Sequence, residues 1–231
     1  MISLHPQVLE LAGADAAVFA HAQFSNDVLA LPDGHWQWNA WLSAQGRVRA
    51  FFRLLRTNAT HLTLTLRGGD ASWMRAELAR FVFRARVQIA VGDGAAQPAT
   101  LADIRAGLPE IGVELRDQLL PQWIGLDRLG AISVRKGCYP GQEIVARLHF
   151  KGGNKRSLYR LCWRGGDALP RPGTPLRDDN AAEAGLIVMA ARAIEDGHLE
   201  ALATLSDAAA DAPLQLESSA AGSVEVIQRF A

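Results

Sequence analysis

The alternation of apolar and polar positions predicts short strands and a few helices in the first half of the chain. Residues 61–66 alternate strictly between a polar side chain and leucine, which indicates a strand with its leucines on a buried face. Two strand-like segments flank Gly46, and this arrangement is typical of a hairpin. The predicted elements are strands at 7–12, 36–42, 48–55, 61–66 and 86–91 and helices at 15–22 and 72–83. This order predicts an antiparallel sheet with helices on one face, an α+β arrangement.

The last third of the chain has a different pattern. Residues 151–157 are rich in glycine and basic side chains and are interpreted as a linker. Short apolar segments separated by Gly, Pro and Asp turns then predict strands at 158–163, 185–191, 201–205 and 224–230. This succession favours a small β-barrel. We therefore predict two domains, an α+β region at 1–150 and a barrel at 151–231, with a mixed segment at 101–120 that Gly107 and Pro109 interrupt.

Composition narrows the classes of function. The 231 residues contain 24 basic and 24 acidic side chains, so the net charge of zero indicates neither a nucleic-acid nor a membrane partner. No apolar run reaches the roughly 20 residues that a membrane helix needs, and the N-terminus has no signal-peptide pattern. Two distant cysteines are typical of a reducing cytosol rather than of a disulfide scaffold. The six scattered histidines predict no metal site.

Chemistry is concentrated in the segment 136–147, Lys-Gly-Cys-Tyr-Pro-Gly-Gln-Glu-Ile-Val-Ala-Arg, which we call the signature segment. Gln142 and Glu143 begin a predicted helix, with an acidic residue in the first turn where the helix dipole favours it. Cys138 is thus placed on a tight loop before a helix N-terminus, with Lys136 nearby, and such surroundings favour a reactive thiolate. A single loop cysteine is more often an inert thiol than a working one, so this alternative stays open.

The signature segment resembles that of the YgfZ family, folate-binding proteins similar to the aminomethyltransferase (T-protein) of the glycine cleavage system. The family pattern is K-G-C-Y-x-G-Q-E followed by a basic residue, and every fixed letter is present, ending at Arg147. The resemblance extends to flanking segments and covers most of residues 8–160. These segments are 13–16, 23–28, 46–48, 121–122, 126–133 and 152–156.

The resemblance implies a fold and a cofactor. The expected fold is a ferredoxin-like α+β region followed by a small barrel, with tetrahydrofolate bound centrally. It implies Cys138 as the working thiol, with Lys136 and Tyr139 beside it. The positions that would bind the folate are Asn26, Asp27, Trp38, Gln122, Gly137, Gly141, Gln142, Glu143 and Arg147. Core packing competes as an explanation for Trp38, because a Trp side chain buries a large area.

One departure from the T-protein pattern affects the expected activity. Authentic aminomethyltransferases carry an aspartate pair after the glycine turn, and here the corresponding letters are Ala50 and Phe51. A reaction that needs a carboxylate at this position cannot run without one. The resemblance thus implies an accessory role in assembling or maintaining iron–sulfur clusters that serve tRNA-modifying enzymes. The alternatives are a one-carbon transferase with an unknown acceptor and, disfavoured by the zero net charge, direct tRNA binding.

Overall fold

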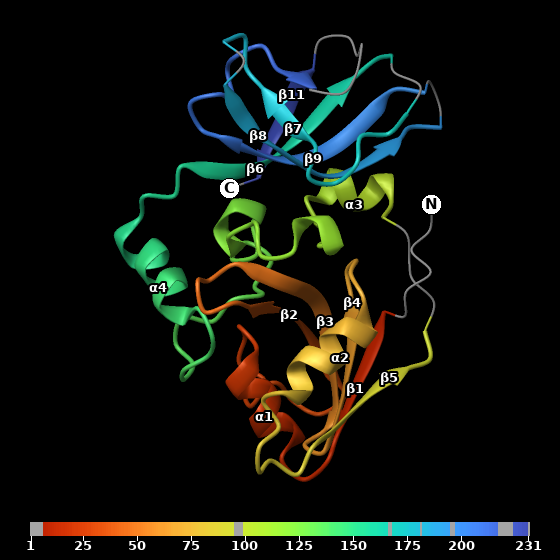
Figure 1. Ribbon diagram of the computed structural model, residues 1–231, viewed down its shortest axis with the longest axis vertical. Coiled ribbons are helices and arrows are strands. Elements are labelled where there is room, and N and C mark those ends of the chain that lie inside the picture. Colours follow the sequence, from red (N-terminus) through yellow and green to blue (C-terminus); the bar gives the residue numbers. More distant parts are fainter. Residues whose placement is uncertain are drawn as a thin grey trace. The chain divides into compact units, whose positions relative to one another are not determined.

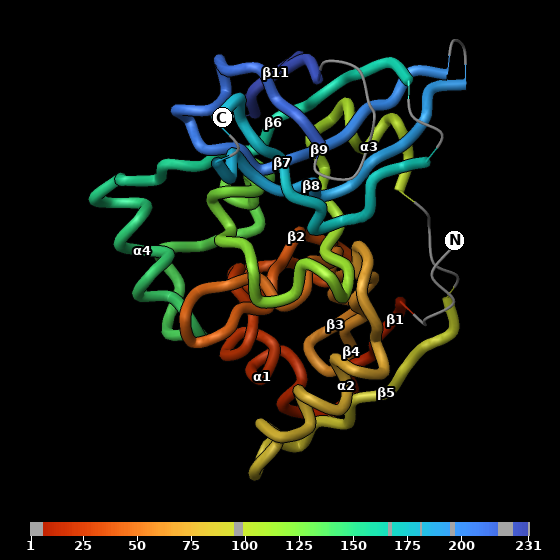
Figure 2. Tube along the Cα trace, turned by 45° about the horizontal axis from the view of Figure 1, so that its top comes forward, coloured from red at the N-terminus to blue at the C-terminus, as the bar shows by residue number. Residues whose placement is uncertain are grey.

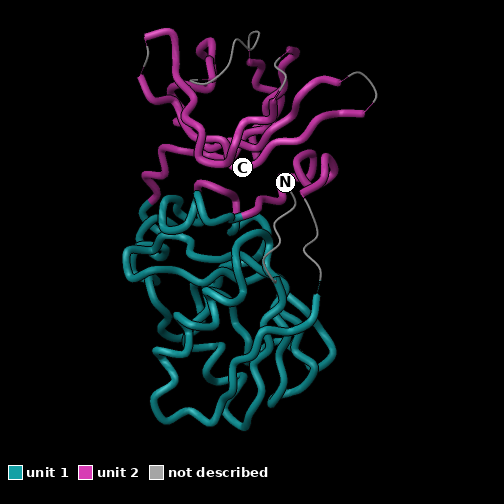
Figure 3. The backbone as a smooth tube through the Cα atoms, turned by 45° about the vertical axis from the view of Figure 1, so that its right-hand side comes forward, with its two compact units in different colours: residues 1–98, 111–121, 126–151 teal, residues 99–110, 122–125, 152–231 magenta. Residues whose placement is uncertain are grey.

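The computed structural model describes residues 7–94, 99–165, 168–180, 182–194, 197–216 and 224–230. The chain forms two compact units, which are coloured in Figure 3. Unit 1 consists of residues 1–98, 111–121 and 126–151, and unit 2 consists of residues 99–110, 122–125 and 152–231. The units interleave along the sequence, since two short segments from the middle of the chain group with the C-terminal strands. The predicted division into domains at residue 150 stays a prediction.

Unit 1 is built around a five-stranded antiparallel sheet in the order β2-β3-β4-β1-β5 (Figure 1). Its strands are β1 (Val8–Ala12), β2 (His35–Leu42), β3 (Val48–Asn58), β4 (His61–Leu66) and β5 (Gln88–Gly92). Its helical elements are α1 (Ala16–Gln23), α2 (Ala71–Ala79), the 3₁₀ turn η1 (Val113–Leu115) and α4 (Gln142–Lys151). The predicted strand at 61–66 is confirmed at both ends. Strand β3 is longer than predicted, because Arg56 still pairs with β2 and β4.

One face of this sheet forms the core of unit 1. Leu62 and Leu64 of β4 are fully buried and belong to the same apolar cluster as Phe19 of α1 and Met74 of α2. Both helices therefore cover the same face of the sheet, as predicted. Figure 2 traces these elements in sequence order, from red β1 to yellow β5. When β2 is set aside, the remaining strands have the order β3-β4-β1-β5. One strand–helix–strand unit contains β1, α1 and β3, the other contains β4, α2 and β5, and the strands of the two units alternate in the sheet.

Helix α2 has a defined start and ends earlier than predicted. Asp70 caps it, because its carboxylate accepts a 2.8 Å hydrogen bond from the backbone N–H of Ser72. The prediction that the helix runs to Phe83 is wrong, since the helix ends at Ala79. Beyond that point the backbone makes tighter i to i−3 bonds, and Phe83 is 85% exposed, so continuing the helix would bury no further apolar surface.

Unit 2 contains a six-stranded antiparallel sheet in the order β10-β7-β8-β9-β6-β11. Its elements are α3 (Leu101–Ala106), β6 (Arg156–Trp163), β7 (Pro175–Arg177), β8 (Glu183–Arg192), β9 (Leu199–Ser206), β10 (Gln215–Leu216) and β11 (Glu225–Phe230), and the 3₁₀ turn η2 (Pro121–Ile124) begins in unit 1 and continues into unit 2. An isolated bridge joins Leu214 to Val224, next to the two edge strands. Within the described residues no continuous ladder closes this sheet into a barrel.

A carboxylate is buried inside unit 2. Glu200 on β9 is fully buried and accepts hydrogen bonds from Arg105 at 2.7 Å, from Arg160 at 2.7 Å and from His198 at 3.1 Å. Burial alone would raise the pKa of the Glu200 carboxyl, but these hydrogen bonds outweigh it and lower that pKa to about 2. Arg105 lies on α3, which begins with a capping box formed by Thr100 and Asp103. The ion cluster therefore ties α3 to the sheet of unit 2.

Candidate functional site

The signature segment packs its backbone against the turn between β2 and β3. Gly141 has a φ of +78°, and a Cβ atom there would lie 2.5 Å from the carbonyl oxygen of Ser43 and 2.6 Å from the Cα of Gly46. Gly46 has a φ of +74°, and a Cβ on it would lie 2.9 Å from the Cβ of Ile144. Only glycine fits at both contact points. Two motifs that are 95 residues apart in sequence, from Gly46 to Gly141, are thus in direct contact.

Lys136 points into unit 1 and is buried, with 6% of its surface exposed. Its ammonium donates to the carbonyl oxygens of His21 and Phe24, at the C-terminal end of α1. A cation suits this position, because the last carbonyls of a helix have no intrahelical donor and carry the negative end of the dipole. Burial lowers the pKa of Lys136 to about 8, against the opposing effect of Asp27. Lys136 therefore links the signature segment to the end of α1.

Tyr139 is also buried, and its ring lies with its centroid 4.8 Å from the Lys136 ammonium. Its hydroxyl donates to the carbonyl oxygen of Ser133 over 3.4 Å. Burial raises the pKa of Tyr139 to about 12, so the phenol is neutral at physiological pH. These contacts hold the loop in shape, and the catalytic role expected for Lys136 and Tyr139 stays a prediction.

Cys138 lies between these two buried residues and is itself exposed. Neither cysteine forms a disulfide, and Cys162 on β6 is half-buried. Burial raises the pKa of the Cys162 thiol, and the nearby carboxylate of Glu200 adds to this effect. The structure therefore presents one accessible thiol, in the loop where the sequence predicts it, and one sheltered thiol in the sheet of unit 2.

The remaining residues of the signature segment differ in their surroundings. Gly137 has open space where a Cβ would stand, unlike Gly141. Gln142 donates from its side chain to the carbonyl oxygen of Lys136 over 3.4 Å, at the start of α4. Glu143 and Arg147 are exposed on α4. Their predicted role in binding a cofactor remains untested by these contacts.

The turn at Asn26 and Asp27 is fastened to the segment that leads into the signature. The Asn26 side-chain amide donates to the carbonyl oxygen of Trp38 at 2.9 Å and to that of Gly130 at 2.7 Å. One Asp27 carboxylate oxygen accepts from the backbone N–H of Ala30 at 3.0 Å. Asn26 thus acts as a structural bridge between β2 and residue 130, besides any role that it has towards a ligand.

Trp38 is half-buried and stands beside two other aromatic side chains of the hairpin. Its ring centroid lies 5.0 Å from that of Phe51 and 5.4 Å from that of Trp36. Phe51 is fully buried and Ala50 is 7% exposed, so apolar side chains occupy the two positions at which the resemblance to T-proteins leads us to look for aspartates. Gln122 belongs to unit 2, and its predicted role in binding a folate stays a prediction.

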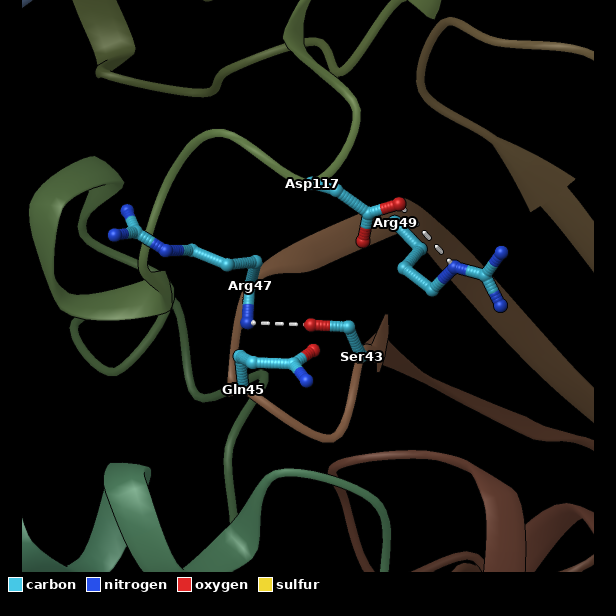
Figure 4. Close-up of a pocket in the computed structure, with 5 residues that line it drawn as sticks. All are labelled: Ser43, Gln45, Arg47, Arg49 and Asp117. Carbon is cyan, nitrogen blue, oxygen red and sulfur yellow. Dashed lines mark hydrogen bonds and ion pairs between the residues drawn. The ribbon is translucent and has the colours of Figure 1, made fainter.

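An open pocket of about 600 Å³ adjoins the turn between β2 and β3 (Figure 4). We call it the turn pocket, and its lining residues are Ser43, Gln45, Arg47, Arg49 and Asp117. Arg47 donates from its side chain to the carbonyl oxygen of Gln118 at 2.6 Å. Arg49 contacts Asp117 at 3.6 Å and the carboxylate of Glu77 at 3.1 Å. All five lining residues are polar or charged.

Trp73 and Arg116, which lie behind this pocket, carry no signal in the sequence that marks them as part of a site. The Arg49 guanidinium lies 4.2 Å from the Trp41 ring centroid and 4.9 Å from that of Trp73, and the Arg116 guanidinium lies 3.4 Å from Trp73. Arg47, Arg49 and Arg53 alternate along the sequence, a pattern that suits an anionic ligand and a solvated strand face equally well. Nothing in the sequence pairs them with Arg116 and Asp117. Among the described residues no group of three metal-ligating side chains comes together.

The comparisons with known proteins agree with the resemblance read from the sequence. The chain is 41% identical over 108 residues to the tRNA-modifying protein YgfZ of Cronobacter sakazakii, a match that covers 46% of this chain and 32% of that relative. The chain thus spans about a third of the length of the curated relative that it matches. No protein-family model matches the chain. None of the helices described is long and apolar enough to cross a membrane.

The fold is similar to that of the crystal structure of glycine cleavage system aminomethyltransferase T from Bartonella henselae. The TM-score is 0.72, and the alignment covers 97% of this chain and 83% of that structure at 15% sequence identity. A likeness at this identity establishes the fold alone. The predicted resemblance to YgfZ proteins and to the T-protein is confirmed by these two comparisons.

Proposed function

We propose that the chain is a tetrahydrofolate-binding accessory protein that supports iron–sulfur enzymes of tRNA modification, with Cys138 as its working thiol. The observation that carries the proposal is the 41% identity to a protein named as tRNA-modifying. The aminomethyltransferase-like fold supports a folate as the ligand, by analogy of fold. Cys138 is exposed on its loop, and the buried side chains of Lys136 and Tyr139 anchor this loop through hydrogen bonds to backbone carbonyl oxygens. This arrangement supports a reactive role for Cys138.

The proposal includes a finer description of the fold. We assign the sheet of unit 1 to a ferredoxin-like arrangement, because each of its two helices connects strands that are not neighbours in the sheet. Helix α1 follows β1 and precedes β2, and α2 connects β4 to β5, with β1 between them in the sheet. We assign unit 2 to a small barrel on the strength of the bridge between Leu214 and Val224. Free thiols in both units support a reducing, cytoplasmic location.

The folate would lie against the half-buried face of Trp38, since a flat pterin ring needs an apolar wall and a few fixed polar groups. Asn26 and Asp27 supply polar groups on the adjoining turn. The further residues proposed for this site are Gly137, Gly141, Gln142, Glu143 and Arg147.

A one-carbon transferase with an unknown acceptor is the second candidate, and the aminomethyltransferase fold favours it. Ala50 and Phe51 weigh against it, because neither can act as the positioned carboxylate of that reaction. We expect no methylene-tetrahydrofolate when the chain meets an aminomethyl-loaded carrier protein. Direct tRNA binding is disfavoured by the zero net charge.

Two measurements test the proposal. Calorimetry with tetrahydrofolate should show saturable binding that weakens in Trp38→Ala, and no heat at millimolar ligand would overturn the folate assignment. Expression in cells that lack their own homologue should restore the activity of an iron–sulfur tRNA-modifying enzyme. Restoration by Cys138→Ala to the same level would overturn the role of the thiol and leave the folate assignment standing.

A further inference from the structure

Strand β5 is an outer strand of the unit 1 sheet, and its far edge is open (Figure 1). It pairs with β1 in antiparallel register, from Gln88 opposite Ala12 to Gly92 opposite Val8. Among the described residues, no backbone hydrogen bond connects residues 88–92 to any segment other than β1. An edge strand of this kind presents a row of backbone N–H and C=O groups that a further strand can bind.

A groove of about 290 Å³ lies between this strand and α2. We call it the edge groove, and its lining residues are Arg75, Ala76, Ala79, Val82, Val87 and Ile89. The two alanines are exposed on α2, and their short side chains leave the space above Val87 and Ile89 unfilled. Val82 and Ile89 pack against the core of unit 1 and are only half-buried, so the groove has an apolar floor.

The loop between α2 and β5 adds apolar surface beside the groove. Phe81 is 39% exposed and Phe83 is 85% exposed. A phenylalanine as exposed as Phe83 contributes little to the core of its own chain. Exposed apolar patches next to charged residues are typical of surfaces that bind another protein.

The charges around the groove favour an acidic partner. The segment 75–92 contains four arginines and a single carboxylate. The carboxylate and two of the arginines are already engaged in ion pairs within unit 1. The other two, Arg75 and Arg84, are exposed and form no ion pair with any described residue. These two charges attract carboxylates, and they disfavour the pairing of two copies edge to edge, which would bring like charges together.

We propose that the edge groove docks an extended, acidic segment of a partner protein, which adds to β5 as a further strand. Successive side chains of a strand point to opposite faces, so every second residue of the segment enters the groove beside α2. Apolar side chains suit these positions because the groove floor is apolar, and carboxylates of the segment pair with Arg75 and Arg84. The inference is independent of the folate assignment, since it uses neither Trp38 nor the signature segment.

The first test measures peptide binding to the full chain by fluorescence anisotropy. The probe is a labelled seven-residue peptide that alternates valine and glutamate and is capped at both ends, and a valine–lysine peptide of the same length is its control. We expect saturable binding of the glutamate peptide, with affinity about tenfold or more above that of the lysine peptide and a gap that narrows at high salt. No binding at millimolar glutamate peptide, or equal affinity of the two peptides, would overturn the proposal.

A second test asks whether the peptide binds as a strand. Two N-methylated versions of the glutamate peptide carry methyl groups on alternate amides, so each lacks the N–H donors of one edge. Only one edge of an added strand faces β5, so one version should bind like the parent peptide and the other should lose binding. Hydrogen exchange of the β5 amides should slow in the parent complex. Equal binding by both versions would overturn strand addition.

Three variants place the binding at the edge groove. Arg84→Glu should weaken the glutamate peptide about tenfold, whereas Lys151→Glu makes the same change of charge on an exposed position of α4 and should leave binding unchanged. Ala79→Leu fills the groove with a residue that favours helices, so it should weaken binding at an unchanged melting temperature. Equal affinities for all three variants and the parent chain would overturn the assignment to this groove.

Two further measurements distinguish the other possible occupants. Sedimentation of the chain alone should show no dimer, and a dimer with protected β5 amides would assign the edge to a second copy and overturn the proposal. A uridine oligonucleotide should leave the exchange of the β5 amides unchanged. Stronger protection of these amides by the oligonucleotide than by the peptide would assign the surface to nucleic acid instead.

Discussion

The signature segment of unit 1 and the Glu200 cluster of unit 2 both bury an ionisable group, but they stabilise it differently. Lys136 meets neutral carbonyl oxygens at the end of α1, and burial dominates its pKa. Glu200 meets two arginines and a histidine, and these partners outweigh burial. The first arrangement supports a loop that carries an exposed thiol, whereas the second ties a helix to a sheet. We infer that the buried charge of Lys136 positions the candidate site in unit 1, whereas the buried charge of Glu200 stabilises the fold of unit 2.

The largest expected effect comes from breaking the contact beneath the signature loop. Gly141→Ala would place a methyl group within 3 Å of three backbone atoms, at a φ that side chains rarely adopt. We expect a loss of about 3 kcal/mol in the free energy of unfolding, together with lost complementation. Gly137→Ala is the control, since open space surrounds that position and its stability should change by less than about 0.5 kcal/mol. Equal melting temperatures for both variants would contradict the proposed backbone contact.

The second effect removes the charge from the cluster in unit 2. Glu200→Gln keeps the shape of the side chain but leaves Arg105 and Arg160 without their carboxylate, and we expect a loss of about 2 kcal/mol. The value is below that for a fully buried pair, because the Arg105 side chain is 43% exposed. Chemical denaturation measures it. Glu183→Gln, at the exposed ion pair with Arg156, should change stability by less than about 0.5 kcal/mol.

Lys136 and Glu200 should also make the free energy of unfolding depend on pH, Lys136 in the alkaline range and Glu200 in the acidic range. The folded pKa of Lys136 is about 8 against 10.5 for an ordinary lysine, so the unfolded chain binds more protons between these values. Stability relative to Lys136→Met should therefore rise with pH across this window, by on the order of 1 kcal/mol per unit. The Glu200 pKa of about 2 lies below 4.5, so its contribution should be lost as pH falls through that range. A flat difference between pH 8 and 10.5 would contradict the burial of Lys136.

How much the sequence could predict differs between the same two regions. The alternation at 61–66 predicted β4 and its buried leucines, because a strand with one buried face repeats every two residues. The signature letters located the exposed thiol. Contacts between distant segments produce no local sequence pattern. The contact between Gly141 and Gly46 could not be predicted, because it depends on the whole fold of unit 1.

The same limit applies to the buried ion cluster. Glu200 lies in an apolar strand, and its partner Arg105 is 95 residues away. The helix that carries Arg105 has a capping box at Thr100 and Asp103, a local signal that sequence reasoning could have used and did not. Local patterns thus predicted elements, while the pairing of buried charges required the structure.

The smallest expected effect on stability separates the two cysteines. Cys138 is exposed on its loop, so Cys138→Ala should change the free energy of unfolding by less than about 0.5 kcal/mol. Cys162 is half-buried on β6, and Cys162→Ala should cost about 1 kcal/mol through lost packing. Function should follow the opposite order, with complementation lost only in Cys138→Ala.

Reactivity provides an independent measure of the same difference. Burial raises the pKa of Cys162 and reduces its thiolate, so a small alkylating reagent at neutral pH should modify Cys138 well before it. Mass spectrometry of partly alkylated protein reads the order directly, and unfolding in denaturant is the control that should bring the two rates together. Faster modification of Cys162 in the native chain would show that the loop shelters its thiol, and would move the working group of the proposed function away from Cys138.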